Sequence, residues 1–185
     1  MRRNRKGFTL IEVMVSVSLF AVIILSVTSI FKMAIDGQRN AIATQNVQES
    51  LKYFLEVTAK EIRMAQKNEG VCPSIPNDEI FLVSESAFGD VLYFKNYYGE
   101  CVNYDLAADG DNLRFRISRG NGSAAPADFI SPAKIRINEL HFVLNNSAST
   151  TQQMVTINLN ANALESAEYK SDMTLQTTIA SRYYK

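Results

Sequence analysis

The sequence is poor in the residue types that build active sites. Its 185 residues include two cysteines, no tryptophan and a single histidine, His141. One imidazole without a matching nucleophile and base cannot form a hydrolase triad. A glycine-rich phosphate loop and a Gly-x-Ser-x-Gly nucleophile elbow are also absent from the sequence. We therefore expect His141 to be structural, and we expect neither enzymatic activity nor a cofactor.

An excess of charge of one sign is missing as well. Lys+Arg and Asp+Glu each count 19, so the formal net charge is zero. Domains that bind nucleic acid through a broad surface carry a clear excess of basic residues. We therefore expect no nucleic-acid partner for this chain.

Long apolar runs are present only at the start of the chain. Four of the first six residues are basic, and residues 8–31 then carry one charge, Glu12. About 20 apolar residues suffice to cross a bilayer, and basic flanking residues stay in the cytoplasm. A cleaved secretory signal would have a shorter apolar run and a small-residue cleavage site. A plain membrane anchor would not explain the carboxylate inside the run.

The residues around Gly7 read KGFTLIE, and this stretch resembles the processing motif of type IV pilins and type II secretion pseudopilins. The resemblance implies that a prepilin peptidase removes residues 1–7 as a leader peptide and N-methylates the new terminal residue, Phe8. It also implies that Glu12 pairs with the Phe8 amine of a neighbouring subunit during assembly. The alternative is that the Glu12 side chain only reaches toward the membrane surface.

The same resemblance implies the partners and the location of the chain. The partners are the prepilin peptidase, other pilin or pseudopilin subunits, an inner-membrane assembly platform and, before assembly, membrane lipid. The chain is anchored first in the bacterial cytoplasmic membrane, with an extracytoplasmic head, and then enters a pilus or pseudopilus. Its layout resembles the larger minor subunits. The competing hypothesis is a single-pass binding domain that does not polymerise.

We expect the N-terminal helix to continue through residues 32–67 as an amphipathic segment. Residues 32–66 contain no proline and only one glycine. Mainly apolar positions recur there every three or four residues, which predicts one face packed on a head domain. These positions are Thr44, Val47, Leu51, Phe54, Thr58, Ile62 and Ala65. Asn68, Gly70 and Pro73 predict the end of the helix.

Residues 68–185 have the alternating pattern of a β-rich head. Apolar and polar residues alternate in short segments that turn-forming residues separate. The expected strands are Ile80–Ser84, Val91–Tyr97, Glu100–Leu106, Asn112–Ser118, Ile135–Asn145, Met154–Asn160 and Met173–Ala180. The predicted fold class is therefore α+β and pilin-like, with a long helix, transmembrane in its first half (residues 8–31), packed on an antiparallel sheet.

Two sets of side chains in the head leave alternatives open. Cys72 and Cys101 would form a disulfide in an oxidising compartment, or remain as buried thiols in a reducing one. Asp105, Asp109 and Asp111 supply oxygen ligands of the kind that calcium prefers. Their spacing is not that of an EF-hand, and Asp-Gly is a common hairpin turn. We therefore expect a turn at these aspartates and no metal site.

Overall fold

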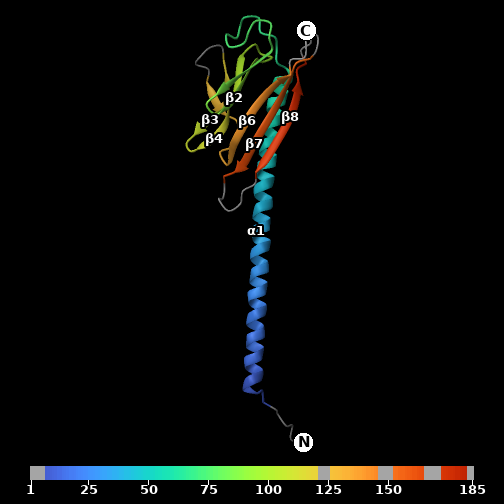
Figure 1. The fold of residues 1–185 in the computed structure, drawn as a ribbon, viewed down its shortest axis with the longest axis vertical. Helices are drawn as coiled ribbons and strands as arrows, with labels where there is room; N and C mark the ends of the chain where they lie inside the picture. Colours follow the sequence, from blue (N-terminus) through green and yellow to red (C-terminus); the bar gives the residue numbers. More distant parts are fainter. Residues whose placement is uncertain (1–6, 121–125, 146–151, 165–171, 183–185) are drawn as a thin grey trace. The chain divides into compact units, whose positions relative to one another are not determined.

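The computed structural model describes residues 7–120, 126–145, 152–164 and 172–182 (Figure 1). One helix, α1 (Leu10–Arg63), precedes the strands in these ranges. The strands are β1 (Phe81–Ser86), β2 (Gly89–Lys95), β3 (Cys101–Asp109), β4 (Asn112–Arg119), β5 (Ala127–Phe129), β6 (Ile135–Asn145), β7 (Met154–Ala163) and β8 (Met173–Ala180). Backbone contacts divide the chain into two units, residues 1–41 and 42–185, which are described separately. Residues 1–6 of the expected leader lie outside the described residues.

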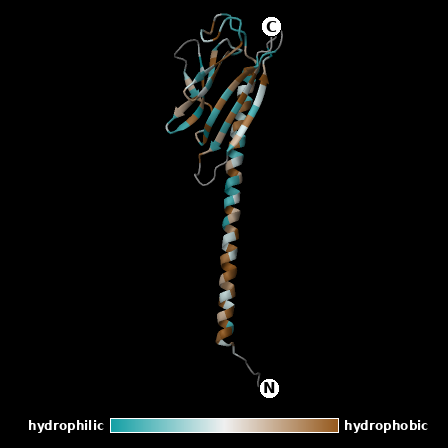
Figure 2. Cartoon of the chain, in the orientation of Figure 1, coloured by the Kyte–Doolittle hydropathy of each residue, from teal (hydrophilic) through white to brown (hydrophobic). Residues whose placement is uncertain are grey.

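The first unit consists of the N-terminal part of α1 and the residues just before it. Figure 2 colours most of this part of the helix as hydrophobic, and its large apolar residues are exposed. The helix is long and apolar enough to cross a membrane, and no residue in its apolar stretch is buried by the protein. A helix that is apolar on every side needs lipid or other protein around it.

The second unit begins with the amphipathic part of α1. The predicted apolar face is confirmed, because six of its seven positions are buried and Thr44 is half-buried. The helix ends at Arg63, slightly earlier than expected, and a tighter turn follows in which the Ala65 N–H donates to the Ile62 carbonyl. Gln66 then forms a β-bridge with Lys95, the last residue of β2, so the chain passes directly from the helix to the end of this strand.

The strands form two antiparallel sheets, where we expected one. The first has the order β1-β2-β3-β4-β5 and the second the order β6-β7-β8 (Figure 1). The observed bounds of β6 and β8 equal the expected ones. The short strand β5 was not expected, because its three residues are all exposed and show no apolar alternation. The predicted class, a long helix followed by antiparallel β structure, is confirmed.

Both sheets share one apolar core with residues 47–65. Phe54 of α1 packs on Phe115 of β4 with ring centroids 4.1 Å apart, and Tyr104 of β3 lies 5.3 Å from the same Phe115 ring. The sheets are also joined by polar contact, because the Asp90 carboxylate of β2 accepts a hydrogen bond from the Phe142 N–H of β6 at 3.0 Å. The head therefore has one core, with the later part of the helix inside it.

Candidate functional site

The expected cleavage site lies in non-helical backbone immediately before α1. Gly7, Phe8 and Thr9 precede the first helical residue, Leu10. The Phe8 side chain is 84% exposed, and a Cβ placed on Gly7 would meet no atom within 4 Å. A peptide bond outside a helix, with little around it, can enter a protease active site in extended form without unwinding secondary structure.

Thr9 caps the start of the helix, a role that the sequence analysis missed. The Glu12 N–H donates to the Thr9 hydroxyl at 3.4 Å, and the Val13 N–H donates to the Thr9 carbonyl at 3.3 Å. Thr followed three residues later by Glu, ahead of an apolar run, is the capping-box pattern, so the signal was present in the sequence. The cap fixes the helix start two residues after Phe8.

Glu12 lies in the first turn of α1 and is exposed. A carboxylate there is favoured by the unpaired N–H groups and the positive end of the helix dipole. The arrangement gives Glu12 two roles that an experiment can separate. It supports the helix start by its position in the capping box, and it offers a negative charge near the N-terminal end of the helix.

Four hydroxyl groups within the apolar stretch are satisfied by the helix itself. Each donates to the carbonyl of the residue four positions earlier, at 2.7–2.9 Å; the donors are Ser16, Ser18, Ser26 and Thr28. In a hydrocarbon environment, polar groups must find partners within the protein. These four hydroxyls therefore do not oppose insertion of the helix into lipid.

A polar cluster joins α1 to the five-stranded sheet. Glu61 accepts hydrogen bonds from the buried Tyr104 hydroxyl and from the Arg119 guanidinium. Burial, with the negative charge of Glu61 beside it, raises the pKa of the Tyr104 hydroxyl far above its ordinary value of 10.0. Tyr104 is therefore a neutral hydrogen-bond donor, and the cluster fixes how the helix lies on the sheet.

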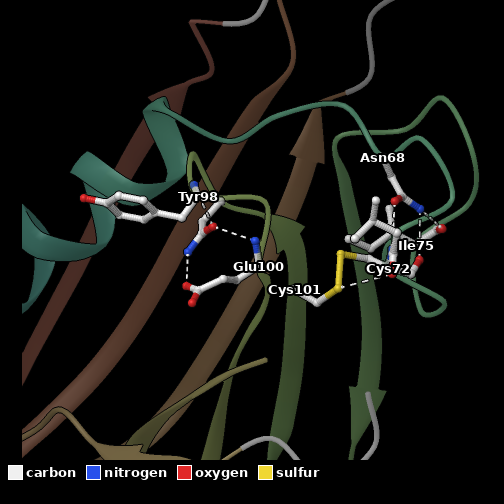
Figure 3. Close-up of a disulfide and its surroundings, with 8 residues drawn as sticks. Asn68, Cys72, Ile75, Tyr98, Glu100 and Cys101 are labelled. Carbon is white, nitrogen blue, oxygen red and sulfur yellow. Dashed lines mark hydrogen bonds between the residues drawn. A yellow bond between two sulfur atoms is a disulfide. The ribbon is translucent and has the colours of Figure 1, made fainter. Parts of the chain in front are cut away.

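A disulfide holds the loop after α1 against the five-stranded sheet (Figure 3). Cys72 and Cys101 are bonded, with their Cα atoms 5.5 Å apart. The buried Asn68 side chain organises the same loop by accepting from the Cys72 N–H at 2.9 Å and donating to the Ile75 carbonyl. A buried amide with several backbone partners fixes a loop that has no regular structure of its own.

A second asparagine organises the turn between β2 and β3. The Asn96 side chain accepts from the N–H groups of Tyr98 and Glu100 at 3.0 and 2.9 Å (Figure 3). It also donates to the Glu100 carboxylate at 2.9 Å. The sequence predicted Asn68 only as part of the helix end and did not indicate Asn96, because an isolated Asn does not reveal which distant backbone groups surround it.

The three aspartates considered as calcium ligands do not converge on one point. The Asp105 and Asp109 carboxylates bind Arg116 and Arg114 respectively. Asp111 lies at the β3–β4 turn, where its backbone carbonyl accepts from Arg136 at 3.0 Å. In the part of the chain that the structure describes, no three His, Cys, Asp or Glu residues are placed to hold a metal ion.

His141 is exposed, and its Nδ1 lies 3.3 Å from the Asp90 carboxylate.

Comparison with known proteins identifies the N-terminal segment. A family model described as the prokaryotic N-terminal methylation motif matches residues 2–28. No curated protein matches the sequence. A type IV-like pilin from Thermus thermophilus is similar in structure, with a TM-score of 0.47 and 9% identity, over 73% of this chain and 95% of that one. The matched motif covers Gly7, Phe8 and Glu12, the three residues that the sequence analysis singled out at the start of the chain.

Proposed function

We propose that the chain is a minor pilin or pseudopilin, a structural subunit of a type IV pilus or of a type II secretion pseudopilus. Residues 1–7 are the leader peptide, residues 8–31 the membrane and filament-core helix, residues 32–67 its amphipathic continuation, and residues 68–185 the head. A prepilin peptidase cuts between Gly7 and Phe8 and methylates the Phe8 amine. The chain itself carries out no reaction.

One observation carries this proposal. The Gly7–Phe8 bond lies in exposed, non-helical backbone directly before a capped helix whose apolar side chains are uncovered. Cleavage there leaves the whole helix on the mature chain and creates a positive amine next to it. A secretory signal would instead lose its apolar segment on cleavage.

The released amine and Glu12 supply the electrostatic part of assembly. A cation and a carboxylate in an apolar medium are each costly alone, and pairing removes much of that cost. Because Glu12 is exposed on the first turn, it can meet the Phe8 amine of a neighbouring subunit. The pair sets the axial position of one helix against the next, and apolar contacts along residues 10–31 supply most of the attraction.

The partners follow from these steps. The chain waits in the cytoplasmic membrane with its head outside, meets the peptidase and the inner-membrane assembly platform, and then packs against other subunits through α1. The second hypothesis is a membrane-anchored binding domain that does not polymerise. It would explain the apolar helix but not the Gly7–Phe8 cleavage site.

Two glycine variants test the proposal in cells that make the complete assembly system. Gly7→Val places a branched side chain at the cleavage site, whereas Gly37→Val places the same side chain within α1, where no atom lies within 4 Å of the new Cβ. We expect Gly7→Val to keep the leader and to be missing from sheared filaments, while Gly37→Val is cleaved and incorporated. Incorporation of an uncleaved Gly7→Val chain would refute the proposal.

A further inference from the structure

The outer face of the five-stranded sheet, which points away from α1, presents a row of polar side chains. Tyr93, Asn103 and Ser118 lie directly opposite one another on β2, β3 and β4. Residues opposite one another in register point to the same face of a sheet. The neighbouring positions Tyr104 and Ile117 point to the other face, into the core.

This row forms the floor of a groove of about 460 Å³. The disulfide-bonded loop lines it from one side, with Pro73 and Ser74, and Ala127 of β5 lines it from another. Ligand sites in proteins commonly measure roughly 300–1,000 Å³. Because the disulfide fixes the loop, this lining is formed before any ligand arrives.

The charges at the groove cancel. Arg116 is the one charged residue in its described lining, and its guanidinium donates to the Asp105 carboxylate at 3.0 Å as part of a two-bond pair. Asp105 is buried behind it and pairs with no other described residue. A strongly anionic ligand would have to compete with Asp105 for Arg116, and a cationic ligand would meet the guanidinium. The groove therefore suits an uncharged ligand.

The floor also has unused hydrogen-bonding capacity. In the described part of the chain, the side chains of Tyr93 and Asn103 have no hydrogen-bond partner, although both are only half-exposed. The Asn103 amide offers two donors and one acceptor. The hydroxyl groups of Tyr93 and Ser118 can each donate and accept, and the outer N–H groups of Arg116 add donors. The Tyr93 ring adds a flat apolar surface beside them.

We propose that this groove binds a neutral saccharide of about two sugar units. Sugar hydroxyls are donors and acceptors at once, which matches an amide, two hydroxyls and a guanidinium on one floor, and the apolar face of a sugar ring can lie on Tyr93. This site goes beyond the assembly role proposed above, since it lies on the head and uses none of the residues of the cleavage motif.

An oligosaccharide array tests the inference with the full-length protein in lipid nanodiscs, because detergents with sugar headgroups would compete. The probes are neutral oligomers of two to four hexose or N-acetylhexosamine units, cell-wall fragments, and sulfated or sialylated counterparts. We expect binding to at least one neutral probe. The identity of that probe then shows whether the ligand comes from the cell wall or from another glycan. Binding to none, or a preference for the anionic counterparts, would overturn the proposal.

Matched variants then locate the site. Asn103→Ala should weaken binding of the selected neutral probe roughly tenfold, about the loss expected from two hydrogen bonds. Asn158→Ala makes the same change on β7 of the other sheet and should leave affinity unchanged. If Asn103→Ala does not fold, the isosteric Asn103→Asp, which exchanges the amide donors for a charge, carries the same expectation. Equal affinity for the wild type and a folded Asn103 variant would show that the sugar binds elsewhere.

Discussion

Gly89 at the start of β2 lies directly against the Leu140 carbonyl of β6. A Cβ on Gly89 would sit 2.8 Å from that carbonyl oxygen, and the glycine has a φ of 136°. Both features exclude a side chain, the first by contact with rigid backbone and the second by conformation. The close approach holds the two sheets together beside the Asp90–Phe142 hydrogen bond.

Gly89→Ala should therefore destabilise the head by about 2–4 kcal/mol, because it adds backbone strain and separates the sheets. Thermal unfolding of the full chain in micelles measures the effect. Gly110→Ala is the control, since Gly110 also has a positive φ, 62°, but a Cβ there would meet nothing within 4 Å. Equal losses in the two variants would show that the contact with Leu140 does not matter.

Tyr104 predicts a loss of stability at high pH. Its pKa is raised in the folded chain relative to about 10 when unfolded. The folded state therefore holds this proton more tightly, so the contribution is complete below pH about 10 and falls as the pH rises above it. The decline in melting temperature between pH about 9 and about 11 should be smaller in Tyr104→Phe than in the wild type. The exposed-ring control Tyr98→Phe should decline like the wild type, and a Tyr104→Phe slope equal to the wild-type slope would contradict the assignment.

Substitutions can separate the capping role of Glu12 from the role of its negative charge. Glu12→Gln keeps a residue that a capping box accepts but removes the charge. If the charge pairs with the Phe8 amine, Glu12→Gln should be cleaved normally but incorporated into sheared filaments at least tenfold less. Thr9→Val removes the cap and keeps the charge, so it should still be incorporated. Normal incorporation of Glu12→Gln would leave the residue with a capping role only.

The Cys72–Cys101 bond closes a loop of 29 residues in sequence. Constraining the unfolded chain in this way stabilises a protein by about 3.5 kcal/mol in the chain-entropy description. Cys72→Ser combined with Cys101→Ser should lower the unfolding free energy by roughly that amount, and reduction of the wild-type protein should reproduce the loss. A thiol titration that finds two free cysteines in the protein from its native compartment would contradict the bond.

The spacing of apolar residues in the sequence predicted much of the fold. The helix face from Val47 to Ala65 and the bounds of β6 and β8 followed from spacings of three to four and of two, because burial of one face imposes those spacings. The division into two sheets did not follow. Alternation within each strand does not show which strands pair, and the packing of one sheet on the other uses contacts such as Gly89 against Leu140, which lie 51 positions apart and leave no periodic signal.

The site residues divide in the same way. Gly7, Phe8 and Glu12 could be proposed because the motif that contains them is a local string of residues, and the Thr9 cap could have been predicted from the same string. Glu61, Tyr104 and Arg119 lie on three different elements, so no local sequence pattern predicts that they form a cluster. Side chains that meet only through the tertiary fold must be seen in the structure.

The most direct test of the account is the mass of the chain taken from the membrane, with fragmentation of its N-terminal peptide. The account predicts a chain that has lost residues 1–7 and begins with Phe8 carrying one added methyl group on its amine. A mature chain that still begins at Met1, in cells with an active prepilin peptidase, would contradict it.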